Sequence, residues 1–92
     1  MSSLVSEVNN FRPVKAWCSA THVHVTSSDG RTIATPLWWY PFLDRLSHEQ
    51  LNTIELMHEG IWWEAVDEGI SVKSMLMGRK MPNAIAPQVA AE

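Results

Sequence analysis

The densest group of chemically active side chains in this 92-residue sequence is a set of three carboxylates. Glu64, Asp67 and Glu68 are spaced so that neighbours three and four residues apart would meet on one face of a helix. A carboxylate pair brought together in this way can act as general acid and general base. Asp67 and Glu68 also precede Ser71, a predicted helix N-cap, where negative charge stabilises a helix by about 0.3–1 kcal/mol. Because this structural role accounts for the carboxylates, we expect no catalytic residues and no enzymatic activity.

A second candidate is a pair of histidines that could bind a metal ion. His22 and His24 alternate with Val23 and Val25, a period of two that predicts a strand with both imidazoles on one face. The sequence places no third ligand at a suitable spacing, so a solvated strand face is the simpler interpretation. The single cysteine, Cys18, excludes an internal disulfide and the usual cysteine-based zinc sites. We therefore expect neither a metal nor a cofactor, and we predict that Cys18 is an inert core thiol.

Paired tryptophans indicate a binding surface. At consecutive strand positions, Trp62 and Trp63 would point to opposite faces of a sheet. One of the two can therefore lie in the core while the other faces solvent, and Trp62, bracketed by Glu59 and Glu64, is the candidate for the exposed position. An exposed aromatic side chain with an acidic rim is typical of a protein-interface hot spot. The alternative is that Trp62 packs beneath a terminal arm or tail.

The net charge of −3 is distributed unevenly along the chain. Residues 1–43 sum to +1, residues 44–68 to −6 and residues 69–92 to +2. Concentrated acid disfavours binding to a phosphate backbone, which needs clustered lysine and arginine. It suits a protein partner with a basic surface, or self-association, although an ordinary solvated surface is the simpler interpretation. The candidate interface consists of Trp62 and the acidic residues Glu59, Glu64, Asp67 and Glu68.

The N-terminal half of the sequence predicts strands joined by a hairpin. Residues 14–18 and 22–26 each alternate in polarity with a period of two. Asp29 and Gly30 follow, and this dipeptide favours the positive φ angles of a hairpin turn. The returning strand should end at Pro36 or lie on a sheet edge, because proline donates no hydrogen bond to a ladder.

Two short helices are predicted in the C-terminal half. Ser47 and Gln50 form a capping-box pattern, so a helix should begin directly after Ser47. Ser71 is a second predicted N-cap, and Gly78 occupies the position after a helix that tolerates a left-handed backbone. Between them, residues 54–58 fit a helical stripe and a strand equally well.

Three blocks of sequence, DGRTIATPLWWYPFL, SHEQLNTIEL and GIWWEAVDEGISVKSMLMGR, together resemble the bacterial domain of unknown function family 2442. The resemblance covers residues 13–79 and supplies no activity. It implies a small α+β fold: an antiparallel sheet of N-terminal strands, a short helical segment, further strands and a final short helix. It also implies that residues 54–58 form a strand and that Trp63, at the family's usual tryptophan position, is buried. The residues that carry it are Asp29, Gly30, Arg31, Pro36, Leu37, Pro41, Gly60, Ile61, Trp63, Asp67, Glu68, Ile70, Ser71, Val72, Leu76, Gly78 and Arg79.

The sequence departs from the family pattern at Glu64 and Gly69, where the family often has proline and an acid. Related proteins resemble partners in small two-gene operons, some of suspected toxin–antitoxin type, and some are joined to a helix-turn-helix domain. The resemblance therefore implies a binding role.

These observations predict one α+β domain over residues 13–79, with a loosely attached arm at 1–12 and a flexible tail at 80–92. The pattern of a signal peptide or a membrane span is not found, so we expect a cytoplasmic protein. The leading hypothesis is a non-enzymatic protein-interaction module, regulatory or antitoxin-like, in a two-gene operon. The alternative is a small-ligand-binding or enzymatic domain that uses the cleft beside Trp62. A nucleic-acid-associated regulator is the third hypothesis.

Overall fold

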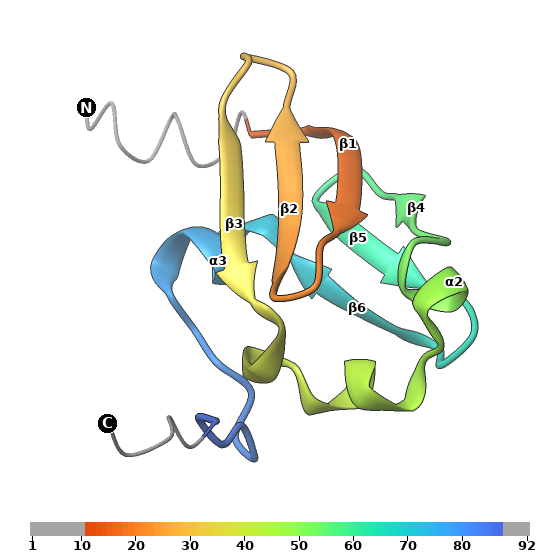
Figure 1. The fold of residues 1–92 in the computed structure, drawn as a ribbon. Helices are drawn as coiled ribbons and strands as arrows, with labels where there is room; N and C mark the ends of the chain where they lie inside the picture. The colour runs from red at the N-terminus through yellow and green to blue at the C-terminus, as the bar shows by residue number, and fades with distance from the viewer. Residues whose placement is uncertain (1–10, 88–92) are drawn as a thin grey trace.

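Six strands form two antiparallel sheets in the computed structural model, which describes residues 11–87 (Figure 1). Sheet A has the order β1-β2-β3 and sheet B the order β4-β5-β6. Four short helical segments accompany the sheets within residues 11–87, which confirms the predicted α+β class. In chain order the elements are β1 (Pro13–Cys18), β2 (His22–Ser27), β3 (Thr32–Pro36), η1 (Leu37–Trp39), η2 (Pro41–Arg45), α2 (His48–Leu51), β4 (Glu55–Leu56), β5 (Gly60–Trp63), β6 (Glu68–Ser71) and α3 (Val72–Met77).

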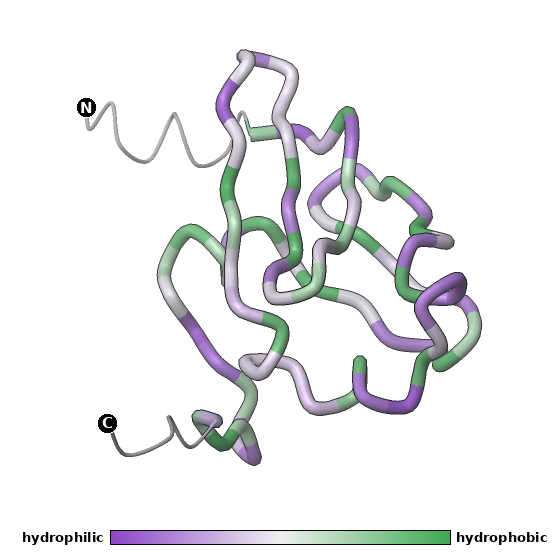
Figure 2. The backbone as a smooth tube through the Cα atoms, viewed as in Figure 1, coloured by the Kyte–Doolittle hydropathy of each residue, from purple (hydrophilic) through white to green (hydrophobic). Residues whose placement is uncertain are grey.

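The hydrophobic core lies between the two sheets. Figure 1 shows β5 and β6 crossing behind sheet A, with α3 beside β3. Val23 and Val25 face this layer from β2 and are fully buried, while hydrophilic neighbours alternate with them along the strand (Figure 2). Ile61 and Trp63 face it from β5. In β2 and in β5, alternate side chains therefore face the core from opposite sides.

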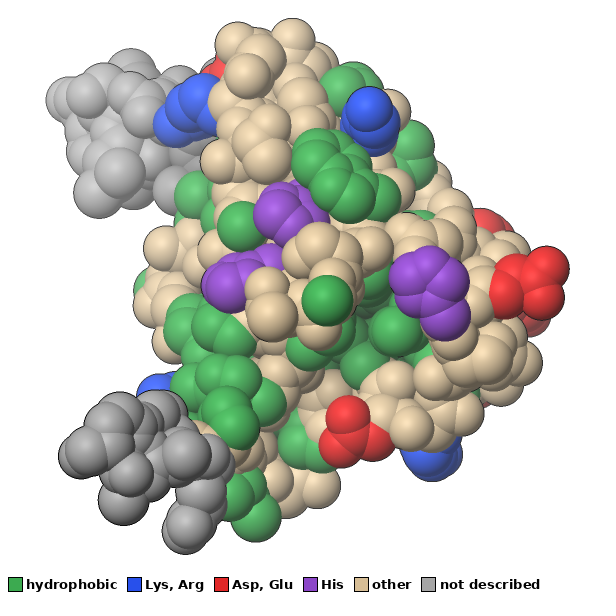
Figure 3. All heavy atoms as spheres, in the orientation of Figure 1, with side chains coloured by type: hydrophobic (Ala, Val, Ile, Leu, Met, Phe, Trp, Pro, Cys, Tyr) green, Lys and Arg blue, Asp and Glu red, His purple; other side chains and the backbone are tan. Residues whose placement is uncertain are grey.

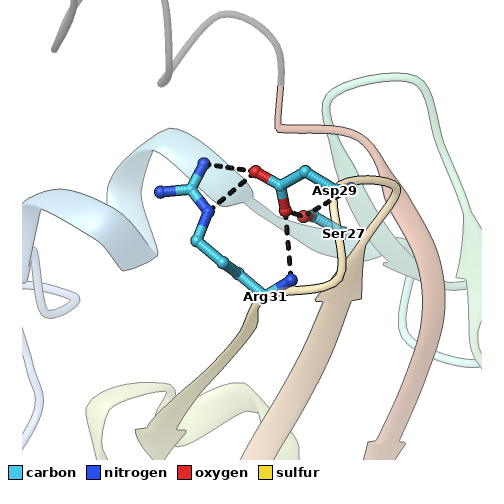
Figure 4. A network of polar contacts seen from close by, with 3 residues as sticks. All are labelled: Ser27, Asp29 and Arg31. Atoms are coloured by element: carbon cyan, nitrogen blue, oxygen red, sulfur yellow. Dashed lines mark hydrogen bonds and ion pairs between the residues drawn. The ribbon is translucent and has the colours of Figure 1, made fainter.

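The β2–β3 hairpin forms at the predicted Asp-Gly turn. Gly30 has a φ of 95°, a backbone conformation that glycine adopts without steric cost. Asp29 binds both ends of the turn: its carboxylate accepts hydrogen bonds from the Ser27 hydroxyl, from the Arg31 amide at 3.1 Å and from Arg31 Nε at 2.8 Å (Figure 4). These bonds stabilise the ionised carboxylate and hold the pKa of Asp29 well below its usual range.

We expect Asp29→Asn to destabilise the protein at neutral pH and to matter less in acid. The pKa of Asp29 is lowered on folding, so its stabilisation is present above the unfolded-state pKa and is lost as pH falls through the folded-state pKa. Urea denaturation of both proteins between pH 7 and pH values below the usual Asp range tests this. A gap in the free energy of unfolding that stays constant with pH would contradict the role given to the carboxylate.

The helical segments confirm the capping signals in the sequence. Ser47 and Gln50 form the reciprocal capping box at the start of α2. Ser71 caps α3, and Gly78 ends it with a φ of 72°. Residues 55–56 form β4, so the strand that the resemblance implied at 54–58 is confirmed, over a shorter range.

The packed part of the chain extends beyond residues 13–79 at both ends. Phe11, predicted to belong to the arm, is buried in the core. Met81, predicted to belong to the tail, packs against the core and donates its amide to Trp39 O at 3.0 Å. The remaining predictions for residues 1–10 and 88–92 lie outside the described residues.

The predicted alternation of β1 fails at its start. The register shifts between Pro13 and Lys15, and Val14 is 52% exposed as a result. Within residues 11–87, no helix is long and apolar enough to cross a membrane.

Candidate functional site

The outer face of sheet B, the face opposite the core, carries Trp62. Ile61 and Trp63 are buried on the inner side of β5, so alternation turns Trp62 outward. Trp62 is paired with Glu55 on β4 and with Gly69 on β6. Its indole therefore stands at the centre of a three-stranded surface, between an acidic residue and a residue without a side chain.

Trp62 is half-buried because its ring packs across β6. A Cβ atom added to Gly69 would lie 2.6 Å from Trp62 Cε3, so glycine is what allows the ring to lie there. On the other side, Trp62 Nε1 donates a hydrogen bond to Glu64 Oε1 at 3.1 Å. The two contacts fix the indole orientation and leave part of the ring open to solvent. Trp62 thus lies on the outer face of sheet B and is half-buried.

A shallow hollow of about 250 Å³ adjoins Trp62, and Met57 and Glu59 form part of its wall. Met57 is 48% exposed and adds a flexible apolar group to the surface. The backbone of Glu59 is fixed because its carbonyl accepts a hydrogen bond from the Val72 amide at 2.9 Å. The volume is below the roughly 300–1,000 Å³ of pockets for drug-sized ligands. The hollow is thus smaller than a typical pocket for such ligands.

Glu55 belongs to this surface and was not predicted from the sequence. It lies directly opposite Trp62 on β4, so their Cβ atoms face the same side of the sheet. Glu55 reaches this surface only through the register of the two-residue strand β4, and the sequence does not specify that register. With Glu59 and Glu64, it makes three glutamates around the indole. Among residues 11–87, none of the three forms an ion pair.

Glu64, Asp67 and Glu68 do not lie on a helix, so the helical carboxylate pair considered from the sequence does not form. Residues 64–67 form the turn between β5 and β6, where Asp67 has a left-handed φ of 55°. Glu68 is paired with Trp63 and lies on the inner side of sheet B, where its carboxylate is 3.8 Å from Arg45 Nη2. Glu68 therefore does not belong to the acidic rim of Trp62.

The sequence suggested that Asp67 and Glu68 stabilise the N-terminus of α3, and this prediction is wrong. β6 separates them from that helix, whose first turn contains no acidic residue. At about 3.3 Å per strand residue, the distance is too great for a helix-end interaction. Asp67 instead lies in the β5–β6 turn, and Glu68 forms an exposed ion pair with Arg45.

The two histidines lie on the outer face of sheet A, as predicted. Figure 3 shows histidine side chains over β2 beside hydrophobic ones. His24 stacks on Trp17 with ring centroids 4.9 Å apart, and its Nε2 lies 3.1 Å from Ser19 Oγ. His22 Nδ1 lies 2.8 Å from Thr21 Oγ1. Within the described residues, no group of three or more His, Cys, Asp or Glu side chains could hold a metal ion.

Cys18 is buried beside the second sheet. Its amide donates to Asn52 Oδ1 at 2.9 Å, and burial raises the pKa of its thiol to about 11. A thiol with so high a pKa carries almost no thiolate at neutral pH and is a poor nucleophile. The structure thus supports the prediction of an unreactive core cysteine.

A larger hollow of about 560 Å³ lies at the opposite end of sheet A from the hairpin turn. His22, Trp38 and Asp44 are among its lining residues, and it shares no residue with the hollow beside Trp62. Trp38 is half-buried there, and the ammonium of Lys80 lies 5.6 Å from its ring centroid. This hollow is therefore separate from the acidic surface.

Comparison with known proteins identifies the family. No curated protein matches the chain. A crystal structure of a protein of unknown function from Rhodospirillum rubrum ATCC 11170 is similar, with 27% identity, a TM-score of 0.70, and coverage of 80% of this chain and 94% of that chain. The family model for "Protein of unknown function (DUF2442)" matches residues 13–81. Because this match spans most of the sequence, the chain belongs to the DUF2442 family.

Proposed function

We propose that this domain is a non-enzymatic protein-interaction module and that its contact surface is the outer face of sheet B. One observation carries the proposal: a half-buried, oriented Trp62 lies among three glutamates that form no ion pair with residues 11–87. Unneutralised acid around an aromatic anchor is complementary to a basic partner surface. The partner is a protein with such a surface, or a second copy of the chain.

Trp62 and the surrounding glutamates are expected to contribute to binding in different ways. Completing the burial of an indole removes apolar surface from water, at roughly 25 cal/mol per Å². The ring is already oriented by Gly69 and Glu64, so little side-chain entropy is lost when a partner covers it. The exposed glutamates contribute chiefly to the rate of encounter. In line with the family resemblance, we place the module as a regulatory or antitoxin-like partner in a two-gene operon.

Trp62→Ala is expected to weaken partner binding or self-association by more than about 2 kcal/mol while the domain stays folded. Trp17→Ala is the matched control, because Trp17 is a half-buried tryptophan on the outer face of the other sheet. Surface plasmon resonance against the purified partner, or sedimentation equilibrium for self-association, measures both. Equal affinity of the two variants would remove Trp62 as the anchor.

Charge at the rim is expected to act on association rather than dissociation. Glu59→Lys should slow association and flatten its dependence on ionic strength, since rim charges mainly steer the encounter. Glu64→Gln is a matched variant that keeps an oxygen acceptor for Trp62 Nε1 and removes only the charge. Kinetics at two salt concentrations separate the effects. If the salt dependence of association is unchanged in both variants, the glutamates do not steer the encounter and are ordinary solvated residues.

A further inference from the structure

Strand β6 presents free backbone groups at one edge of sheet B. In the part of the chain that the structure describes, it pairs with β5 alone, and the Val72 amide donates to Glu59 O at the end of this ladder. In an antiparallel ladder, residues with bonds to one neighbour alternate with residues whose bonds point the other way. The register thus directs Ile70 toward β5 and turns the amides of Gly69 and Ser71 away from it. Outside that ladder, neither amide donates to any of residues 11–87.

The segment that follows α3 forms the second wall of a groove along this edge. Residues 79–82 line a hollow of about 260 Å³ together with Gly69, Ile70 and Ser71. The hydrogen bond from the Met81 amide to Trp39 O holds this wall in place, and Figure 1 shows the chain running from α3 toward η1. The edge of β6 therefore forms one wall of the groove, and residues 79–82 form the other.

The outer wall is basic. Arg79 is exposed and borders the groove, and it has no ion pair among residues 11–87. Lys80 also borders it, with its ammonium 5.9 Å from the ring centroid of Trp39. A guanidinium and backbone amides that have no partner among the described residues are together suited to a carboxylate.

We propose that this groove takes an extended peptide segment of the partner, which adds as a strand to β6 and places a carboxylate against Arg79. Main-chain hydrogen bonds to Gly69 and Ser71 would supply affinity, and the carboxylate would supply specificity. The inference rests on the proposed function and refines it. Gly69 lies beneath the Trp62 ring, so one partner can contact both the groove and the outer face.

A synthetic probe tests strand addition directly. The probe is an acetylated, amidated pentapeptide of alternating valine and aspartate, titrated into the ¹⁵N-labelled protein. We expect the amide resonances of Gly69 and Ser71 to shift, and about tenfold weaker binding of a valine–lysine counterpart. A valine–aspartate peptide that is N-methylated at every residue, so that neither of its edges can donate a backbone hydrogen bond, should not bind. Unshifted Gly69 and Ser71 resonances, or equal shifts from the N-methylated peptide, would overturn the proposal.

Variants at Ser71 isolate the backbone contribution. Gly69 is unsuitable, because an added Cβ would lie 2.6 Å from Ile61 O. Ser71→Pro removes the amide, and the Ser71 φ of −82° is close to the value that proline requires. Ser71→Ala removes only the capping side chain and is the matched control. We expect Ser71→Pro to abolish peptide binding, Ser71→Ala to keep it, and Arg79→Gln to weaken it about tenfold.

The same variants separate this inference from the proposed function. If Trp62→Ala weakens partner binding while Ser71→Pro and Arg79→Gln bind like the unmodified protein, strand addition is wrong and the outer-face proposal stands. If Ser71→Pro and Arg79→Gln weaken partner binding while Trp62→Ala does not, the groove is supported as a site of its own and the outer-face proposal fails.

Discussion

Replacing Trp63 by alanine is expected to lower the free energy of unfolding by about 3–5 kcal/mol. The indole is fully buried, lies 5.7 Å from Phe42 between ring centroids, and donates its Nε1 hydrogen to Leu51 O at 2.9 Å. Alanine would leave a cavity and an unpaired carbonyl in the core. Since small domains have only about 5–15 kcal/mol of stability, the variant should lose a large fraction of it.

Two further variants separate the causes of that loss. Trp63→Phe keeps an aromatic ring but removes the donor to Leu51 O, so it should cost about 1–3 kcal/mol. Trp17→Ala removes an indole that stacks on His24 outside the core and should cost about 1 kcal/mol. Urea denaturation followed by circular dichroism measures all three. A loss below 1 kcal/mol in Trp63→Ala would disprove its place in the core.

Gly60→Ala should destabilise the protein by about 3 kcal/mol, at the upper end of the range for overpacking. A Cβ atom at Gly60 would overlap the carbonyl oxygen of Ile70 and lie 3.0 Å from Ser71 Cα. Both are backbone atoms of β6 and its helix cap, so no side-chain rotation relieves the clash. The two strands must separate or shift.

Gly78→Ala is the control for Gly60→Ala. An added Cβ at Gly78 meets nothing within 4 Å, so only its left-handed φ of 72° matters, at about 1 kcal/mol. Thermal unfolding by calorimetry orders the two variants. If Gly78→Ala proved the more destabilising, the close approach of β5 and β6 at Gly60 would be refuted.

Features set by local hydrogen bonding were predictable from the sequence. The capping box of Ser47 and Gln50, the Asp29-Gly30 turn and the Gly78 helix end each depend on residues within a few positions of one another. Period-two alternation predicted that Trp62 and Trp63 face opposite sides of β5, and the family resemblance predicted which of the two is buried.

Features set by strand register were not predictable. Glu55 lies on the candidate surface because β4 pairs with β5 so that Glu55 is opposite Trp62. Glu68 lies on the other face because it is opposite Trp63. One residue of slip would exchange these faces, and the local sequence does not specify that slip. Val14 is exposed for a related reason, since the register shift between Pro13 and Lys15 depends on β2.

The groove along β6 also required the structure. Its outer wall is held by a contact between Met81 and Trp39, which are far apart in sequence. The basic residues Arg79 and Lys80 were visible in the sequence, but nothing there places them beside Gly69. The sequence therefore predicted the elements and one anchor, and the pairing of strands determined which charges surround that anchor.

The most direct test of the outer face of sheet B is photocrosslinking in the cells that produce the protein. A photoreactive benzoylphenylalanine replaces Met57 beside Trp62, and in a control protein it replaces Val14; the two positions are 48% and 52% exposed. We predict a discrete protein adduct from position 57 that Trp62→Ala removes, and no such adduct from position 14. Adducts of equal yield from both positions, or an adduct at position 57 that persists in Trp62→Ala, would contradict a partner surface centred on Trp62.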